Sequence, residues 1–261
     1  MEKQLWKACK DGNLKEVRIL LQSSGINPNW QYSDYQHSTP LFIACFQGCL
    51  EVVKLLLNDK RIDINQANED EVTPFYVACY NGNIEIVKLL LSDNRVDINK
   101  AENDDKTPFY IACSKGYIEI VKLLLNEERV DINKANNNGV TPFYVVCWNR
   151  HIEIVKLLLN DQRVDINKAN NDGRTPIFVA CWSGHIEIVK LLVNDKRIDI
   201  NKGDDNGWTP FYIAYQNGLT EIVNVLRNES NLFFFPSFFY LSNNFLILFH
   251  RRNQIKSQRR N

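Results

Sequence analysis

The dipeptide Thr-Pro recurs along this chain at a constant interval, and this spacing constrains the fold more than any other feature. It occurs six times at intervals of 34 residues, at positions 39–40, 73–74, 107–108, 141–142, 175–176 and 209–210. A fixed period of this length is typical of proteins that stack one small unit many times. The chain is therefore expected to fold as a line of repeats.

The residues around each Thr-Pro repeat with it, as a comparison of KTPFYIACSKGYIEIVKLLLNEERVDINKANNNG (106–139) with RTPIFVACWSGHIEIVKLLVNDKRIDINKGDDNG (174–207) shows. A degenerate copy precedes the first Thr-Pro, because residues 5–9 align with residues 109–113. We number the seven copies as repeats 1 to 7. They span about 1–36, 37–70, 71–104, 105–138, 139–172, 173–206 and 207–230, and a hydrophobic and then basic tail follows at 231–261.

Each copy predicts two short helices followed by a loop. Thr107 is suited to cap a helix that begins at Pro108, since proline at the first helical position sacrifices no hydrogen bond. Gly116 is expected to end this helix. Ile118, Val121, Leu124 and Leu125 are expected to form the buried stripe of the second helix. Residues 131–133 are expected to be extended, and residues 138–139 to form a tight turn at the tip of a finger-like loop.

These motifs resemble those of the ankyrin-repeat family. Residues 107–112, Thr-Pro-Phe-Tyr-Ile-Ala, are similar to the family pattern Thr-Pro-Leu-His-x-Ala, and residues 184–192 and 130–133 resemble the second helix and the segment after it. The tetratricopeptide pattern, which also has 34 residues, places its proline late in the unit. The resemblance implies an all-α fold, an α-solenoid of stacked helix-turn-helix units with finger-like hairpin loops.

The chain departs from the family pattern at two positions. The usual histidine is replaced by tyrosine or phenylalanine, so the family's histidine–threonine hydrogen bond is lost unless a tyrosine hydroxyl replaces it. Arg150 stands where the other copies have glycine between the two helices. A residue other than glycine is strained at positive φ. We therefore expect the Arg150 turn to be the least stable turn of the array.

Six of the seven cysteines occupy one position of the repeat, at 9, 45, 79, 113, 147 and 181. A redox or metal-binding column is one interpretation. However, packed helices lie about 8–10 Å apart, which is too far for a disulfide or for shared zinc ligands. We therefore expect these thiols to be small core side chains in a reducing compartment, and Cys49 to lie near the surface.

The remaining composition argues against several classes of function. Residues 1–230 carry 26 basic and 31 acidic residues, so a nucleic-acid partner is not expected. No phosphate-binding loop, nucleophile–base pair or metal-ligand cluster is present, so neither an enzyme nor a cofactor or metal site is predicted. The charged N-terminus lacks the apolar run of a signal peptide, which favours a cytoplasmic protein.

The positions that vary between copies are the strongest indication of function. The two residues after the cysteine position and the residue before each threonine differ from copy to copy, although the framework is nearly constant. The family resemblance places these positions in the concave groove and at the finger tips. Trp and Tyr are enriched at binding hot spots, although rings that merely fill gaps between repeats are the alternative. The predicted partner-binding residues are Phe46, Gln47, Tyr80, Asn81, Lys115, Trp148, Asn149, Arg174, Trp182 and Trp208.

The sequence therefore predicts a scaffold or adaptor that binds a protein partner. Residues 232–249 are an 18-residue apolar run followed by basic residues, so a membrane-tethered adaptor is the alternative function. The same run is also compatible with a cap over the last repeat or with a non-native extension. The partner, the pathway and the oligomeric state cannot be predicted from these patterns.

Overall fold

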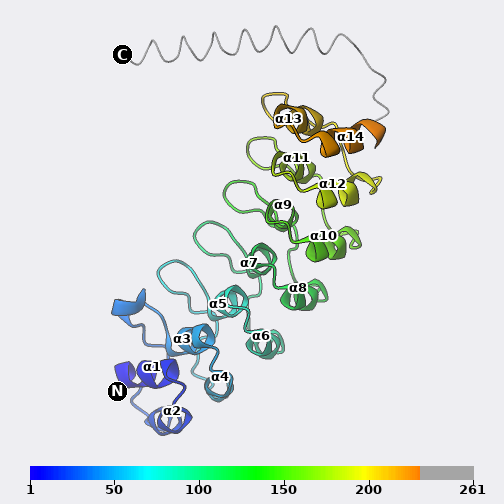
Figure 1. Ribbon diagram of the computed structural model, residues 1–261. Helices are drawn as coiled ribbons and strands as arrows, with labels where there is room; N and C mark the ends of the chain where they lie inside the picture. The colour runs from blue at the N-terminus through cyan, green and yellow to red at the C-terminus, as the bar shows by residue number, and fades with distance from the viewer. Residues whose placement is uncertain (230–261) are drawn as a thin grey trace, which may run out of the picture.

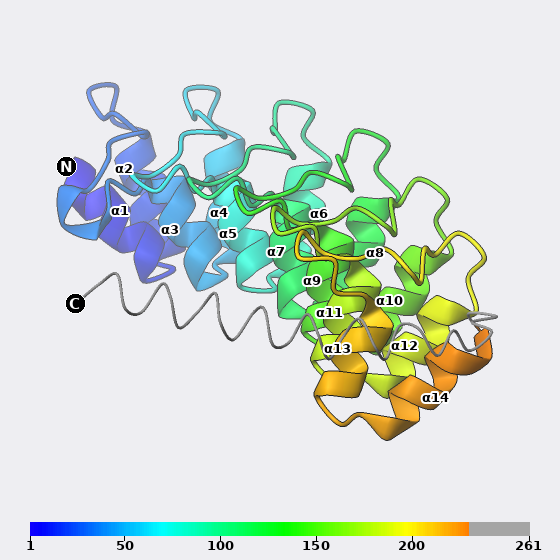
Figure 2. The ribbon, with the colours of Figure 1, turned by 90° about the horizontal axis from the view of Figure 1, so that it is seen from above.

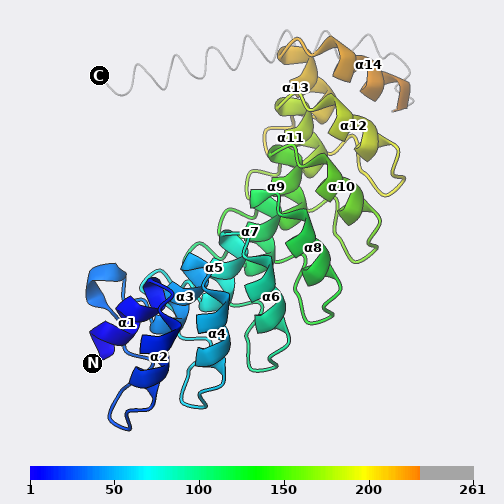
Figure 3. The same ribbon diagram turned by 60° about the horizontal axis from the view of Figure 1, so that its bottom comes forward.

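The structure is a computed structural model that describes residues 1–229, and within this range the fold is all α. Two rows of antiparallel helices are stacked into a curved rod (Figures 1 and 3). The odd-numbered helices form the inner row: α1 (Glu2–Lys10), α3 (Pro40–Gln47), α5 (Pro74–Tyr80), α7 (Pro108–Lys115), α9 (Pro142–Trp148), α11 (Pro176–Trp182) and α13 (Pro210–Gln216).

The even-numbered helices form the outer row, and a 3-10 turn η1 (Ser33–Tyr35) precedes α3. The inner helices contact one another more extensively than the outer helices do, and this closer packing curves the rod toward the inner row. The outer helices are α2 (Leu14–Leu21), α4 (Leu50–Leu57), α6 (Ile84–Leu91), α8 (Ile118–Leu125), α10 (Ile152–Leu159), α12 (Ile186–Val193) and α14 (Thr220–Glu229).

The inner helices begin as the Thr-Pro motif predicts. In every copy from repeat 2 to repeat 7 the threonine hydroxyl accepts a hydrogen bond from the backbone N–H three residues later, and proline stands at the start of the helix. Tyr110 N–H, for example, donates to Thr107 Oγ1 over 3.1 Å. The tyrosine hydroxyl does not restore the missing family bond in repeat 5, since Tyr144 Oη is buried without a hydrogen-bond partner among residues 1–229.

The buried stripe of the outer helices differs slightly from the prediction. In α8 the fully buried side chains are Ile120, Val121, Leu124 and Leu125, whereas Ile118 is only half-buried. The spacing of the four buried positions defines one face of the helix. Ile118 lies at the edge of that face and packs against the core while half-buried, whereas Ile120, which the predicted stripe leaves out, is buried.

The segment after each outer helix is a turn, so the predicted extended conformation of residues 131–133 is wrong. The Asp131 carboxylate accepts the backbone N–H of Asn133 over 3.1 Å, which closes a local turn. The Asn133 side chain then bonds to the next repeat: its Nδ2 donates to Arg163 O over 2.7 Å, and its Oδ1 accepts from Asp165 N over 2.9 Å. Asn65, Asn99 and Asn167 make the same pair of bonds, so this asparagine links neighbouring repeats.

The finger loops project from the inner row as tight backbone turns. Within each loop one backbone pair closes the turn, such as Asn136 N to Val140 O at 3.0 Å. Neighbouring loops are joined to each other as well, as Asn137 N donates to Asp104 O over 3.0 Å. Gly139 lies at φ 74° at one of these tips. Seen from above, the tight turns between paired helices lie along one edge of the stack, and the connections from one repeat to the next lie along the opposite edge (Figure 2). The fingers are therefore a continuous, hydrogen-bonded rim.

The sequence predictions about membrane association and about the Arg150 turn meet the structure differently. Among residues 1–229, no helix combines the length and the apolar composition that crossing a bilayer requires. The apolar run 232–249 lies outside the described residues, as do the basic residues that follow it. Arg150 does adopt the positive φ that its position predicts, at 61°.

Candidate protein-binding groove

Four aromatic rings form a row along the inner face of the stack. Phe46, Tyr80, Trp148 and Trp182 occupy the same repeat position at the end of their helices, and they are 44%, 40%, 48% and 41% exposed. The first six residues of each of these helices are buried. Together with Tyr215 of α13, which is 50% exposed, the rings are the large apolar side chains that the inner helices of the described range present to solvent.

Two predicted binding residues are cations that lie over these rings. Lys115 Nζ lies 4.2 Å from the centroid of the Tyr80 ring, and the Arg174 guanidinium carbon lies 4.6 Å from that of Trp182. Contacts of this kind are attractive because the face of an aromatic ring is electronegative. Among the four rings, Phe46 and Trp148 have no such cation in the described part of the chain.

Two other predicted residues are used inside the stack. Asn81 Nδ2 donates to Phe46 O over 2.8 Å, and Asn149 Nδ2 donates to Ser114 O over 2.9 Å, in each case to the end of the preceding inner helix. Carbonyl groups at the end of a helix accept no hydrogen bond from within that helix, so the asparagine amides supply the missing donors. Gln47 is exposed, whereas Trp208 is half-buried and packs edge-on against Tyr212 with centroids 5.5 Å apart.

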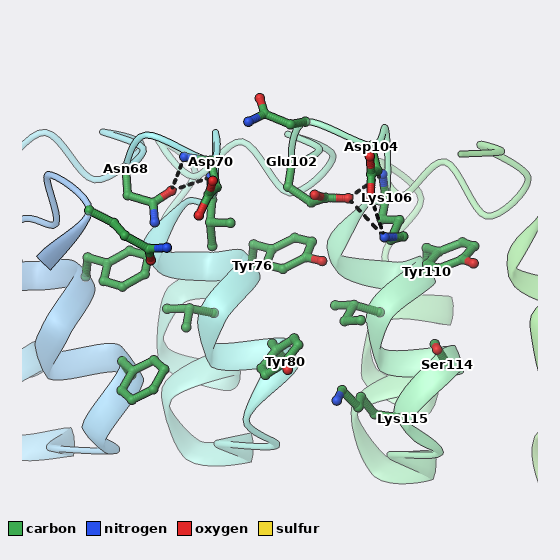
Figure 4. Close-up of a pocket in the computed structure, with 17 residues that line it drawn as sticks. Asn68, Asp70, Tyr76, Tyr80, Glu102, Asp104, Lys106, Tyr110, Ser114 and Lys115 are labelled. Atoms are coloured by element: carbon green, nitrogen blue, oxygen red, sulfur yellow. Dashed lines mark hydrogen bonds and ion pairs between the residues drawn. The ribbon is translucent and has the colours of Figure 1, made fainter. Parts of the chain in front are cut away.

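An open groove lies between the finger rim and the ring row in repeats 2 to 4. It encloses about 750 Å³. Phe46, Tyr76 and Tyr80 line its floor, and Asp70, Glu102 and Asp104 line the edge formed by the fingers. Figure 4 shows these carboxylates above the tyrosine rings, with Ser114 and Lys115 on the opposite side. The groove thus combines an aromatic floor with one acidic edge.

The electrostatic surroundings change along the inner row. Burial raises the pKa of Tyr76, and the nearby carboxylate of Glu102 raises it further. Burial likewise raises the pKa of Tyr110 to about 12, with a further contribution from Glu102. At Tyr144 burial also raises the pKa to about 12, but there the charge of Arg174 acts in the opposite direction. The groove is therefore acidic beside repeats 3 and 4, and a cation faces the tyrosine of repeat 5.

The cysteine column lies in the core. All six thiols of the column are buried, and burial raises the pKa of each well above its ordinary value. Such thiols are poor nucleophiles and poor metal ligands because the thiolate is the reactive form. Cys49 is only half-buried, as expected. Within the described range no three histidine, cysteine or acidic side chains are grouped closely enough to hold a metal ion.

The acidic edge was not among the sequence-based site residues. Acidic residues recur with the repeat, as solvated caps do, so the recurrence alone does not distinguish Asp70, Glu102 and Asp104. A usable indication was nevertheless present, since the finger loop 66–72 contains Glu69, Asp70 and Glu71 and no basic residue, whereas loop 134–140 contains one lysine and no acidic residue. The difference between copies, and not the recurrence, marks these side chains.

The arrangement of helix pairs, fingers and inner groove defines the class of protein: a helical-repeat solenoid. Family models described as ankyrin repeats match residues 5–57 and 41–91 and, further along the chain, residues 75–170, 130–204 and 162–233. The chain belongs to the ankyrin-repeat family. Ankyrin repeats are generally protein–protein interaction modules without enzymatic activity. Among curated proteins, none matches the chain.

Proposed function

We propose that this chain is an interaction scaffold that binds a segment of a partner protein along the inner face of the repeat array. The observation that carries the proposal is the row of exposed rings, Phe46, Tyr80, Trp148 and Trp182. Rigid, partly exposed aromatic side chains supply much of the energy of protein interfaces, because they bury a large area at little cost in conformational entropy. The finger rim and Gln47, Arg174 and Trp208 would contribute polar and peripheral contacts.

The alternative is that the rings only fill gaps between repeats. The contacts of Trp148 and Trp182 argue against this, since their nearest ring partners lie within their own helices, at 6.0 Å for Tyr144 and 6.2 Å for Phe178. Side chains that joined adjacent repeats would pack across the gap between inner helices. About half of the Trp148 surface remains exposed instead.

The test uses the full-length chain as bait and compares it with the variant Trp148→Ala/Trp182→Ala. Captured proteins are quantified by mass spectrometry, and circular dichroism checks that the variant remains folded. We expect at least one specific partner to fall by about tenfold or more, because hot-spot truncations cost about 2 kcal/mol or more. Ile19→Ala is the matched control, since Ile19 is 68% exposed on the outer helix α2. Equal capture by all three proteins would refute the groove assignment.

A membrane-tethered adaptor is the second candidate, and the sequence of the run 232–249 is what favours it. Fractionation of cells that express the full-length chain or residues 1–230 separates the two proposals. A tether predicts that the full-length chain sediments with membranes and that the shortened chain does not. Identical distribution of the two proteins would remove the tether and leave the groove proposal unaffected.

A further inference from the structure

The inner face contains an internal example of how it holds a cation. In repeat 6 the guanidinium of Arg174 lies over the Trp182 ring and reaches toward the Phe178 ring, whose centroid is 6.0 Å away. Arg174 Nη1 also lies 3.2 Å from the Asp172 carboxylate in the same finger loop. Arginine is thus held between a finger carboxylate and two rings of the inner helix.

The finger loop that leads into repeat 3 contains the same carboxylate, and repeat 3 contains the same two ring positions, but no cation stands at the arginine position. Asp70 corresponds to Asp172, while Tyr76 and Tyr80 correspond to the two rings. Val72 stands where repeat 6 has Arg174. Repeat 4 follows the pattern of repeat 6, because Lys106 occupies the arginine position and donates to Asp104 over 2.8 Å.

The carboxylate of Asp70 is consequently left without compensation. Asp70 is exposed, and within residues 1–229 its carboxylate makes no ion pair or hydrogen bond. Its neighbours do not supply a spare cation: Glu69 is paired with His37, and Lys100 Nζ lies 2.6 Å from Glu71. Beyond Asp70, Glu102 and Asp104 add two further carboxylates along the same edge of the groove, and Lys106 serves both of them.

From this comparison we infer that the groove of repeats 2 to 4 binds a basic segment of a partner protein. A lysine or arginine of that segment would supply the cation that is missing because Val72 stands at the arginine position. Its charged group would lie beside Asp70 and over the Tyr76 ring, and an apolar side chain next to it would contact Phe46. The charge complementarity between the acidic edge and the basic segment specifies the partner's chemistry. This inference rests on the proposed function of the inner face as a protein-binding surface.

Lys115 is the charge that opposes such a ligand. Its ammonium group lies over Tyr80 on the side of the groove away from the fingers (Figure 4). The partner's cation is therefore directed toward the finger edge, where the carboxylates are. Removing the charge of Lys115 should strengthen the binding of a basic segment, whereas removing the charge of Asp70 should weaken it.

The probe is a library of random 12-residue peptides displayed on phage and selected against the full-length chain. We expect the selected peptides to be enriched in lysine or arginine adjacent to an apolar residue. The dissociation constant of one synthetic winner is then measured against four proteins: the wild type, Asp70→Asn, Lys115→Gln and Glu85→Gln. Glu85→Gln is the matched control, since it removes one carboxylate of the same repeat from the outer helix α6.

Asp70→Asn is expected to weaken the peptide about tenfold, as the loss of one charge-assisted contact does. Lys115→Gln is expected to tighten binding about twofold to threefold, and Glu85→Gln to leave it unchanged. Equal affinities for Asp70→Asn and Glu85→Gln, or winners without basic residues, would overturn the inference.

The Trp148→Ala/Trp182→Ala variant separates this failure from that of the proposed function. If the affinity of the selected peptides does not change in Asp70→Asn but falls in Trp148→Ala/Trp182→Ala, only the basic-segment inference is overturned. The inner face then remains the binding surface. If neither variant changes the affinity of the selected peptides, or if the library yields no binder, the inference and the proposed function are overturned together.

Discussion

Repeat 5 in the interior and repeat 7 near the end of the described range share the motif Thr-Pro-Phe-Tyr at the start of the inner helix, but the two aromatic side chains of this motif differ in burial. Phe143 and Tyr144 of repeat 5 are 1% and 0% exposed. Their counterparts in repeat 7, Phe211 and Tyr212, are only half-buried. The same side chains therefore bury more apolar area when a repeat lies on both sides. Burial in this fold depends on neighbours more than on the repeat itself, as expected for a linear array.

The largest expected effect is the difference in unfolding free energy between truncating the equivalent phenylalanines of repeats 5 and 7. Phe143→Ala should cost about 3–5 kcal/mol, because it leaves a cavity in a fully packed site. Phe211→Ala should cost roughly half as much, since less apolar area is lost and solvent fills the space. Urea unfolding followed by circular dichroism measures both values.

Equal losses for the two variants would contradict the comparison, because they would mean that the end repeat is packed as tightly as the interior. A control is provided by Ile19→Ala, which truncates an exposed side chain and should change the midpoint little. The shape of the transition is informative as well. A destabilised interior repeat should separate the array into two parts that unfold at different urea concentrations.

A smaller difference is expected at the glycine turns between paired helices. Gly116 and Gly218 lie at φ 78° and 68°, so alanine is strained in both by about 1 kcal/mol. A Cβ on Gly116 would lie 2.6 Å from His151 Cε1 of the next repeat, whereas a Cβ on Gly218 would meet no atom within 4 Å. Moving His151 would break its 2.9 Å hydrogen bond to Ser114 O.

Gly116→Ala should therefore cost about 1 kcal/mol more than Gly218→Ala. Comparing the two variants isolates the energetic cost of the contact between repeats, because both variants have the same kind of backbone strain. Thermal or urea unfolding of the two proteins under identical conditions gives the difference. If the two substitutions were equally costly, the neighbour across the turn would be irrelevant and only the local conformation would matter.

The features that the sequence predicts well are those that a single repeat determines by itself. The threonine cap, the helix that starts at proline and the positive φ of Arg150 each depend on a few neighbouring residues. The exposed ring row was also predictable, because Phe46, Tyr80, Trp148 and Trp182 fill a position where the other copies carry polar residues. These predictions required only the period and the chemistry of each residue type.

The features that were missed depend on contacts between repeats. Asn133 bonds to the repeat that follows, and Asn149 to the repeat before it. Neither bond can be inferred from the unit in which the side chain lies. Asp70 is a different case. The alignment of the copies shows that Val72 replaces a cation, but this replacement matters only once the contacts of Arg174 in repeat 6 are known.

The smallest expected effect is a gain in stability from Arg150→Gly. Arg150 occupies the interior turn that lacks glycine, and the substitution relieves about 1–2 kcal/mol of backbone strain. Two losses offset part of this gain. Glycine raises the entropy of the unfolded chain, and the Arg150–Glu187 pair at 3.6 Å is lost, although both side chains are mostly exposed, at 61% and 58%. A surface pair of this kind contributes ~0.5 kcal/mol.

The entropy term costs about 0.7 kcal/mol and the ion pair ~0.5 kcal/mol, so we expect a net gain of roughly a few tenths of a kcal/mol, measured as a slightly higher urea midpoint. Arg150→Ala is the control that separates the terms, because it removes the ion pair and keeps the strained backbone. It should be neutral or slightly destabilising. Equal midpoints for the glycine and alanine variants would show that the positive φ of this turn costs nothing. The interior position would then tolerate a side chain that Gly116, one repeat earlier, excludes through its contact with His151.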